Sequence, residues 1–122
     1  MMNEEPVTKF EPRESILVDP RGQIIRTITR ELDPVIGTGV GGVLAAGENV
    51  ERMALFFVSS DAGGFFVSPI IQTPLLPVVS SGGPVAPILI HISTYPGLIF
   101  GNWYVLAPLG QVVRVFETDV QR

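Results

Sequence analysis

The stretch RMALFFVS, residues 52–59, combines aromatic and aliphatic side chains and predicts a β-strand. The turn sequence SDAGG follows at residues 60–64, and a second strand-like run, FFVSPII, occupies residues 65–71. Two such runs joined by a short glycine-containing turn are typical of a β-hairpin, so we expect them to pair. Pro69 has no backbone N–H to donate, and it therefore either places the second strand at an edge or ends it.

Similar runs lie on both sides of this segment. Towards the C-terminus, strands are predicted at ILIHIS (88–93), NWYVL (102–106) and QVVRVFET (111–118). Towards the N-terminus, residues 16–18 and 23–32 flank DPRG (19–22), in which proline and glycine occupy positions that a type I turn favours. We expect a second hairpin there.

Two segments are less regular. VIGTGVGGVLAAG (35–47) holds five glycines and predicts a loop that leads into an irregular strand. A phosphate-binding loop would need a Gly-Lys-Ser/Thr ending and a following helix, and the segment has neither. Residues 72–87 are rich in proline, serine and glycine, which predicts a long loop with a short strand at 75–79.

These elements indicate an all-β protein with about eight short antiparallel strands. Many short strands separated by turn residues are typical of a β-sandwich or barrel, and a jelly-roll-like arrangement is expected here. The chain of 122 residues is long enough for one domain, which we place at residues 16–122. Residues 1–15 are charged and contain two prolines, which indicates an extended N-terminal arm.

Charge is distributed very unevenly along the chain. Residues 62–113 form a run of 52 residues without Asp, Glu, Lys or Arg, whereas residues 1–33 hold twelve charged side chains. So long a run cannot all be core, and exposed surface without charge indicates contact with another protein. The alternative is a surface of Ser, Thr, Gly, Gln and Pro that needs no partner.

The interface prediction falls on apolar and aromatic residues of this uncharged run. Trp103 and Tyr104 are adjacent, so in a strand they face opposite sides, and one of them is expected in the core. The predicted interface residues are Phe65, Phe66, Pro74, Leu75, Leu76, Pro77, Trp103 and Tyr104.

The sequence predicts no enzyme. Its single histidine, His91, lies in an apolar run, and with no cysteine there is no basis for a catalytic, metal or cofactor site. A net charge of −4 and a single lysine argue against nucleic-acid binding, and neither a signal peptide nor a membrane-spanning run is present. Arg52 and Glu117 are candidates for a structural ion pair across strands, of little value if exposed.

Four segments resemble a pattern found in small tailed-bacteriophage virion proteins. Residues 48–60 (ENVERMALFFVSS) are similar to an Arg-x-x-Leu-x-aliphatic-x-Asn/Ser strand, and residues 64–69 (GFFVSP) to a Gly-x-aromatic-Val-small-Pro strand. Residues 101–107 (GNWYVLA) resemble a Gly-x-aromatic-aromatic/small-aliphatic-x-Ala strand, and residues 112–117 (VVRVFE) a closing Val-x-Val-x-Glu. The resemblance covers about residues 48–117, and the family pattern carries no catalytic residues.

This resemblance implies a non-enzymatic structural protein of the virion, assembled in the host cytoplasm. It implies a capsid decoration (cement) or minor capsid protein, with a neck or tail component or a receptor- or carbohydrate-binding tail module as the alternative. The expected partners are the major capsid protein or other virion proteins, together with further copies of the chain in a homo-oligomer, which we take to be a trimer. A small hydrolase of cupin or barrel type is the remaining hypothesis, and the single histidine argues against it.

Overall fold

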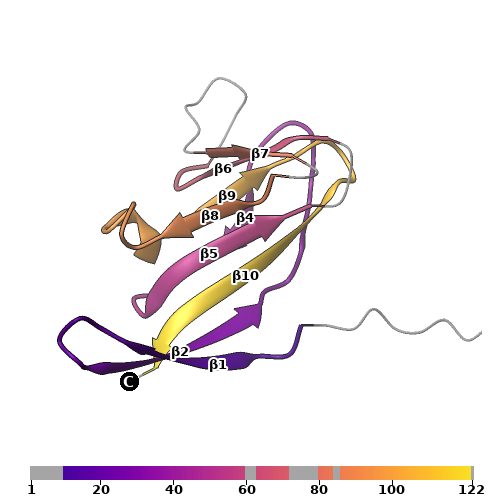
Figure 1. Cartoon of the computed structure of the whole chain (residues 1–122). Helices are drawn as coiled ribbons and strands as arrows, with labels where there is room; N and C mark the ends of the chain where they lie inside the picture. Colours follow the sequence, from indigo (N-terminus) through magenta and orange to yellow (C-terminus); the bar gives the residue numbers. More distant parts are fainter. Residues whose placement is uncertain (1–9, 60–62, 72–79, 84–85, 122) are drawn as a thin grey trace, which may run out of the picture.

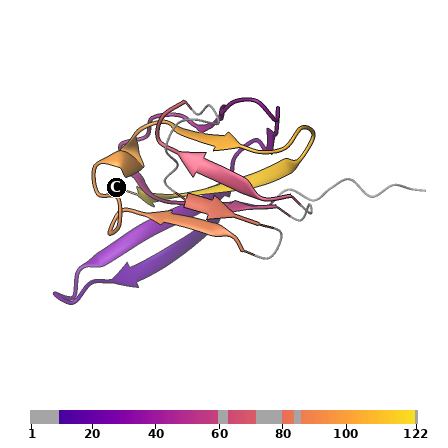
Figure 2. The same cartoon turned by 90° about the horizontal axis from the view of Figure 1, so that it is seen from above.

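The computed structural model describes residues 10–59, 63–71, 80–83 and 86–121, and it is all-β, as predicted. Two antiparallel sheets face each other as the layers of a β-sandwich (Figures 1 and 2). The large sheet has the order β1 (Arg13–Val18), β2 (Ile24–Glu31), β10 (Val112–Gln121), β5 (Arg52–Val58) and β8 (Ile88–His91), with β3 (Val35–Ile36) also beside β10. The small sheet has the order β4 (Val43–Ala46), β9 (Trp103–Leu106), β6 (Phe65–Ser68) and β7 (Ser80–Gly82).

The predicted N-terminal hairpin is confirmed. β1 and β2 pair antiparallel from Arg13 opposite Thr29 to Val18 opposite Ile24. The Asp19 carboxylate accepts hydrogen bonds from the backbone N–H groups of Arg21 and Gln23, at 2.8 and 2.9 Å, which fixes the turn. β1 begins at Arg13, so the strand includes the last three residues that were assigned to the arm, and residues 1–9 lie outside the described part of the chain.

The hairpin predicted for residues 52–71 is wrong. β5 pairs with β10 and β8 in the large sheet, whereas β6 pairs with β9 and β7 in the small sheet. The chain therefore crosses between the two layers after β5. Because every second residue of both strands points into the same core, an alternating pattern does not distinguish this crossing from a hairpin. β6 ends at Ser68, as expected from the proline that follows it.

The described residues form ten strands, more than the eight expected. The glycine-rich segment supplies both β3 and β4, and β7 lies in the predicted long loop, while the short strand predicted at 75–79 falls outside the described residues. Helical structure in the described chain is limited to one 3-10 turn, Leu98–Phe100. Gly37, just after β3, lies so close to the backbone of Ala107 and Pro108 that no side chain fits there.

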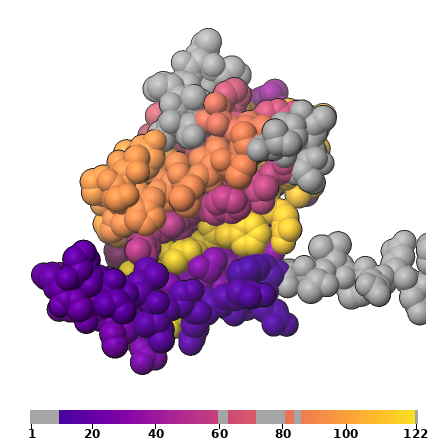
Figure 3. Space-filling view, viewed as in Figure 1, coloured from indigo at the N-terminus to yellow at the C-terminus, as the bar shows by residue number. Residues whose placement is uncertain are grey.

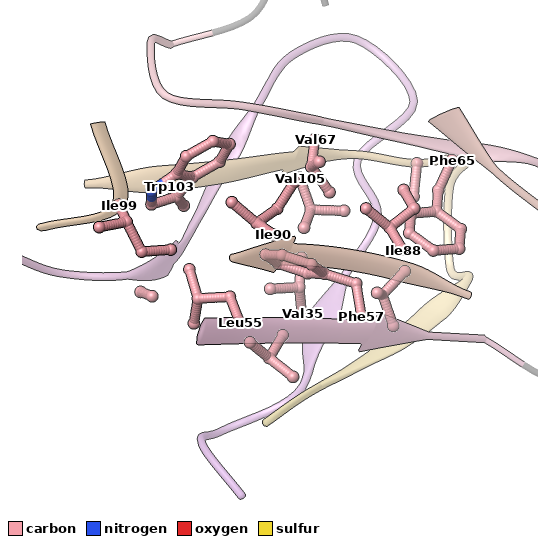
Figure 4. Packing of buried hydrophobic residues seen from close by; sticks show 14 residues of the cluster. Val35, Leu55, Phe57, Phe65, Val67, Ile88, Ile90, Ile99, Trp103 and Val105 are labelled. Carbon is pink, nitrogen blue, oxygen red and sulfur yellow. The ribbon is translucent and has the colours of Figure 1, made fainter. Parts of the chain in front are cut away.

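The core lies between the two sheets (Figure 4). Leu55 and Phe57 of β5 and Ile90 of β8 point towards the small sheet, and all three are buried. From the small sheet, Val67, Val105 and Trp103 point back and are fully buried. The indole N–H of Trp103 donates to the Leu98 carbonyl at 3.0 Å, so its one polar atom is satisfied inside the core.

Candidate functional site

The charged residues of the strands are all on one sheet. β4, β6, β7 and β9 of the small sheet contain no Asp, Glu, Lys or Arg. The strands of the large sheet contain Arg13, Glu14, Arg26, Arg30, Glu31, Arg52, Arg114, Glu117 and Asp119. The uncharged run of the sequence supplies three of the four strands of this uncharged layer, β6, β7 and β9, while β4 comes from outside the run and β8 of the run lies in the large sheet.

The outer face of the small sheet carries apolar and aromatic side chains. Leu44 pairs with Tyr104, and Leu106 pairs with Phe66, so these four residues share the face that points away from the core. Leu44 is 53% exposed and Phe66 40% exposed, and the other two are half-buried. We call this set of four residues the small-sheet face.

The predicted interface residues divide between this face and the core. Phe66 and Tyr104 belong to the small-sheet face, where a partner can contact them. Phe65 and Trp103 point inward with no exposed surface, because their neighbours in the strand take the outward positions, so these two are core residues and not surface residues. Pro74, Leu75, Leu76 and Pro77 lie outside the described residues.

Arg52 and Glu117 form the ion pair that the sequence suggested, but it is buried. The Arg52 Nε donates to Glu117 Oε2 at 2.8 Å, and the side chains are only 1% and 8% exposed. Nη1 also donates to the carbonyls of Ile99 and Gly101, at 2.8 and 2.7 Å, and Nη2 donates to the Gly47 carbonyl. Arg52 thereby ties the 3-10 turn and the end of β4 to the large sheet, which is a structural role.

Asp119 lies beside this pair and completes a small polar cluster. It accepts a hydrogen bond from the Asn49 amide at 2.9 Å and pairs with Arg30 at 3.5 Å. Burial raises the pKa of Asp119 above its ordinary value, the charge of Glu117 raises it further, and the hydrogen bond from Asn49 works in the opposite direction. Each carboxylate of the cluster thus has a cationic or amide partner within the fold.

A shallow groove of about 430 Å³ lies on the outer face of the large sheet. Its aromatic residues are Phe10, Phe56 and Phe116, and the rings of Phe10 and Phe116 meet edge to face at 5.3 Å between centroids. Arg114 stacks over Phe116 at 5.2 Å and forms two hydrogen bonds with Glu31, both at 2.8 Å. The chain's own Phe10 thus occupies part of the groove.

The single histidine, His91, contacts Ser93, two residues further along the chain. His91 is half-buried, and its Nδ1 contacts Ser93 Oγ at 2.8 Å and accepts from the Ser93 backbone N–H at 3.0 Å. Across the described ranges, no group of three or more His, Cys, Asp or Glu residues is placed to hold a metal ion. No helix in the part of the chain that was searched is long and apolar enough to cross a membrane.

One exposed apolar element was not predicted from the sequence. Ile16, Val18 and Ile24 of the β1–β2 hairpin are 62%, 67% and 66% exposed. They lie in the predicted N-terminal hairpin, in the charged first third of the chain, whereas the interface prediction was confined to the uncharged run. The available signal was the run of three apolar residues in β1, Ile16 to Val18, because a strand that is apolar at consecutive positions carries apolar side chains on both of its faces.

When this chain was compared with protein-family models, with curated proteins and with solved structures, none of them matched it.

Proposed function

We propose that this protein is a non-enzymatic structural subunit that is incorporated into a larger protein assembly through its small-sheet face. The observation that carries the proposal is the separation of charge: one layer of the sandwich has every charged strand residue and the other has none. A layer that only had to face water would normally carry mixed charges.

The composition of the face matches a protein contact. Interface cores are depleted of charge and enriched in aromatic residues, and Phe66 and Tyr104 supply two aromatic rings beside two leucines. Burying the exposed parts of Leu44 and Phe66 under a partner would release water from apolar surface, which is the main favourable term in association.

We further propose that the assembly is a virus particle and that the protein is a capsid decoration or minor capsid protein. The support for this step is the resemblance of residues 48–117 to small tailed-bacteriophage virion proteins, to which the two-layered β-structure is suited. On a lattice, many modest contacts act together, and linkage of two sites alone raises overall affinity by about 10²–10⁴.

Particles purified from the source of this chain provide the first test. Quantitative mass spectrometry is expected to find the protein at a fixed number of copies per particle, and gold-labelled antibody is expected to mark the shell. Label confined to one vertex would instead support the neck or tail alternative. Absence of the protein from washed particles would refute the virion proposal.

A pair of variants tests the small-sheet face itself. Phe66→Lys places a charge on the face and is expected to abolish incorporation into particles, while the circular dichroism spectrum shows that the variant still folds. Val50→Lys is the matched control, since Val50 is 75% exposed in the turn before β5 and lies off the face. Equal incorporation of both variants would show that the small-sheet face makes no contact.

A further inference from the structure

The β1–β2 hairpin extends past the rest of the sandwich. Within the described residues, β10 pairs with β2 only as far as Gln121 opposite Arg26, and no third strand lies beside the part of the hairpin beyond that register. Figure 2 shows the two indigo-to-purple strands projecting away from the two-layered body, and Figure 3 shows the hairpin below the yellow band of β10. The second sheet, which ends at β4, does not cover this projection.

The core-facing side of the large sheet continues onto the hairpin as an uncovered apolar row. Asp119 of β10 is buried on the core-facing side, and Ile28 of β2 lies directly opposite it. Because side chains alternate along a strand, Ile24, Arg26 and Arg30 of β2 lie on the same side as Ile28. The register of the hairpin adds Glu14, Ile16 and Val18 from β1. Three of these side chains, Ile16, Val18 and Ile24, are each about two-thirds exposed. We call this the hairpin face.

Two opposite charges beside the apolar row have no ion-pair partner within the described residues. Glu14 lies opposite Ile28, and Arg26 lies opposite Ile16, so the acid and the base are diagonal neighbours on the same face. Both are exposed. Two neighbouring arginines already have partners within the chain, since Arg30 pairs with Asp119 and Arg13 stacks over the Phe10 ring.

We infer that the hairpin face binds the same face of a second copy of this chain, about a two-fold axis that runs along the hairpin. Such a rotation places β1 of each copy over β2 of the other. Val18 then meets Ile24 of its partner, and Arg26 lies over Ile16 with its guanidinium next to Glu14 of the other copy. Every contact occurs twice, as in any isologous interface.

This arrangement favours a second copy over an unrelated protein, because the acid and the base of the hairpin face are complementary to those of the same face in a second copy. Its apolar row offers roughly 300–400 Å² per copy, less than the ~800 Å² per partner of a stable interface. We therefore expect a reversible dimer, one that is reinforced when many copies gather on a particle. The inference deepens the proposed function, and rests on it for that last step only.

Charge-reversal variants of the full chain test the contact, with sedimentation velocity across a concentration series as the measurement. Glu14→Arg puts two cations together in each half of the interface, and Arg26→Glu puts two acids together. Either variant alone is expected to weaken the dimer by at least about 10-fold, because the repulsion occurs twice. An equimolar mixture is expected to recover the dimer as a heterodimer, since each reversed residue then faces its opposite charge.

The controls separate this inference from the proposed function. Ile16→Thr with Val18→Thr keeps β-branched side chains in an exposed strand and is expected to abolish the dimer with an unchanged circular dichroism spectrum. A wild-type monomer at all concentrations, or a trimer that persists in the reversed variants, would overturn the inference. Incorporation of monomeric variants into particles, through the small-sheet face, would leave the proposed function standing.

Discussion

Replacing Arg52 with methionine tests which interactions hold the two layers of the sandwich together. The change keeps an unbranched side chain of related length in β5 but removes the positive charge and all of its donors. Glu117 then remains buried without its cation, and the carbonyls of Ile99, Gly101 and Gly47 lose a donor.

The expected cost follows from burial. With Arg52 only 1% exposed and Glu117 only 8%, water cannot replace the lost partner, and breaking a buried pair in this way costs about 3–5 kcal/mol. For a domain of this size that loss corresponds to a fall of roughly 10–20 °C in Tm. It is a large part of a total stability of about 5–15 kcal/mol.

Arg114→Met is the matched control. Arg114 of the neighbouring strand β10 also contacts a glutamate at 2.8 Å, Glu31 of β2, but the Arg114 side chain is 47% exposed. An exposed pair contributes about 0–1 kcal/mol, and the stacking over Phe116 adds about 0.5–1 kcal/mol. Urea unfolding followed by the fluorescence of Trp103, the only tryptophan, measures both variants. If Arg52→Met costs no more than Arg114→Met, burial is not what makes the Arg52 pair important.

Three further changes probe other parts of the fold. Asp119→Asn is expected to stabilise the protein at neutral pH. Folding raises the pKa of Asp119, so the stability of the wild-type protein falls as pH rises from the ordinary pKa through the raised one. The stability gained by Asp119→Asn should therefore vanish when urea unfolding is measured at a pH below the ordinary pKa. Gly37→Ala is expected to cost about 2–3 kcal/mol, because the new methyl would collide with the carbonyl oxygens of Ala107 and Pro108, and thermal melts would show it. Trp103→Phe is expected to cost about 1–3 kcal/mol in urea unfolding followed by circular dichroism, from the lost volume and the lost hydrogen bond to Leu98.

The strands were largely predictable because their signal is local. Alternation in Gln111–Thr118 and the turn residues around Asp19 depend on near neighbours, and both elements formed as expected. Strand pairing depends on distant residues. β5 took β10 and β8 as neighbours, across more than 30 residues in each case, and nothing in the sequence between β5 and β6 excludes a hairpin.

The candidate site was predictable in its region but not in its residues. The uncharged run contains three of the four strands of the small sheet, because the absence of charged residues can be seen in the sequence without knowing how the strands pair. It also contains β8, which pairs with β5 in the large sheet, so the run alone does not define the layer. A period of two shows only that Phe65 and Phe66 face opposite sides. Which of them faces the core depends on the phase of β6 against β9, and this pairing put Phe66 outside.

The separation of charge gives the two proposed contact surfaces different properties. The hairpin face has an acid and a base beside its apolar row, and such charges give a contact direction and register. The small-sheet face has none, so its contact must depend on shape and apolar burial, which any charged substitution would disrupt. The hairpin face would bind a second copy of the chain and the small-sheet face would bind the assembly, so the two contacts would not compete for the same surface. Variants at Glu14 and Arg26 should therefore lose dimerisation, and variants at Phe66 should lose incorporation into particles. A variant that combines both changes should lose both properties, with additive effects.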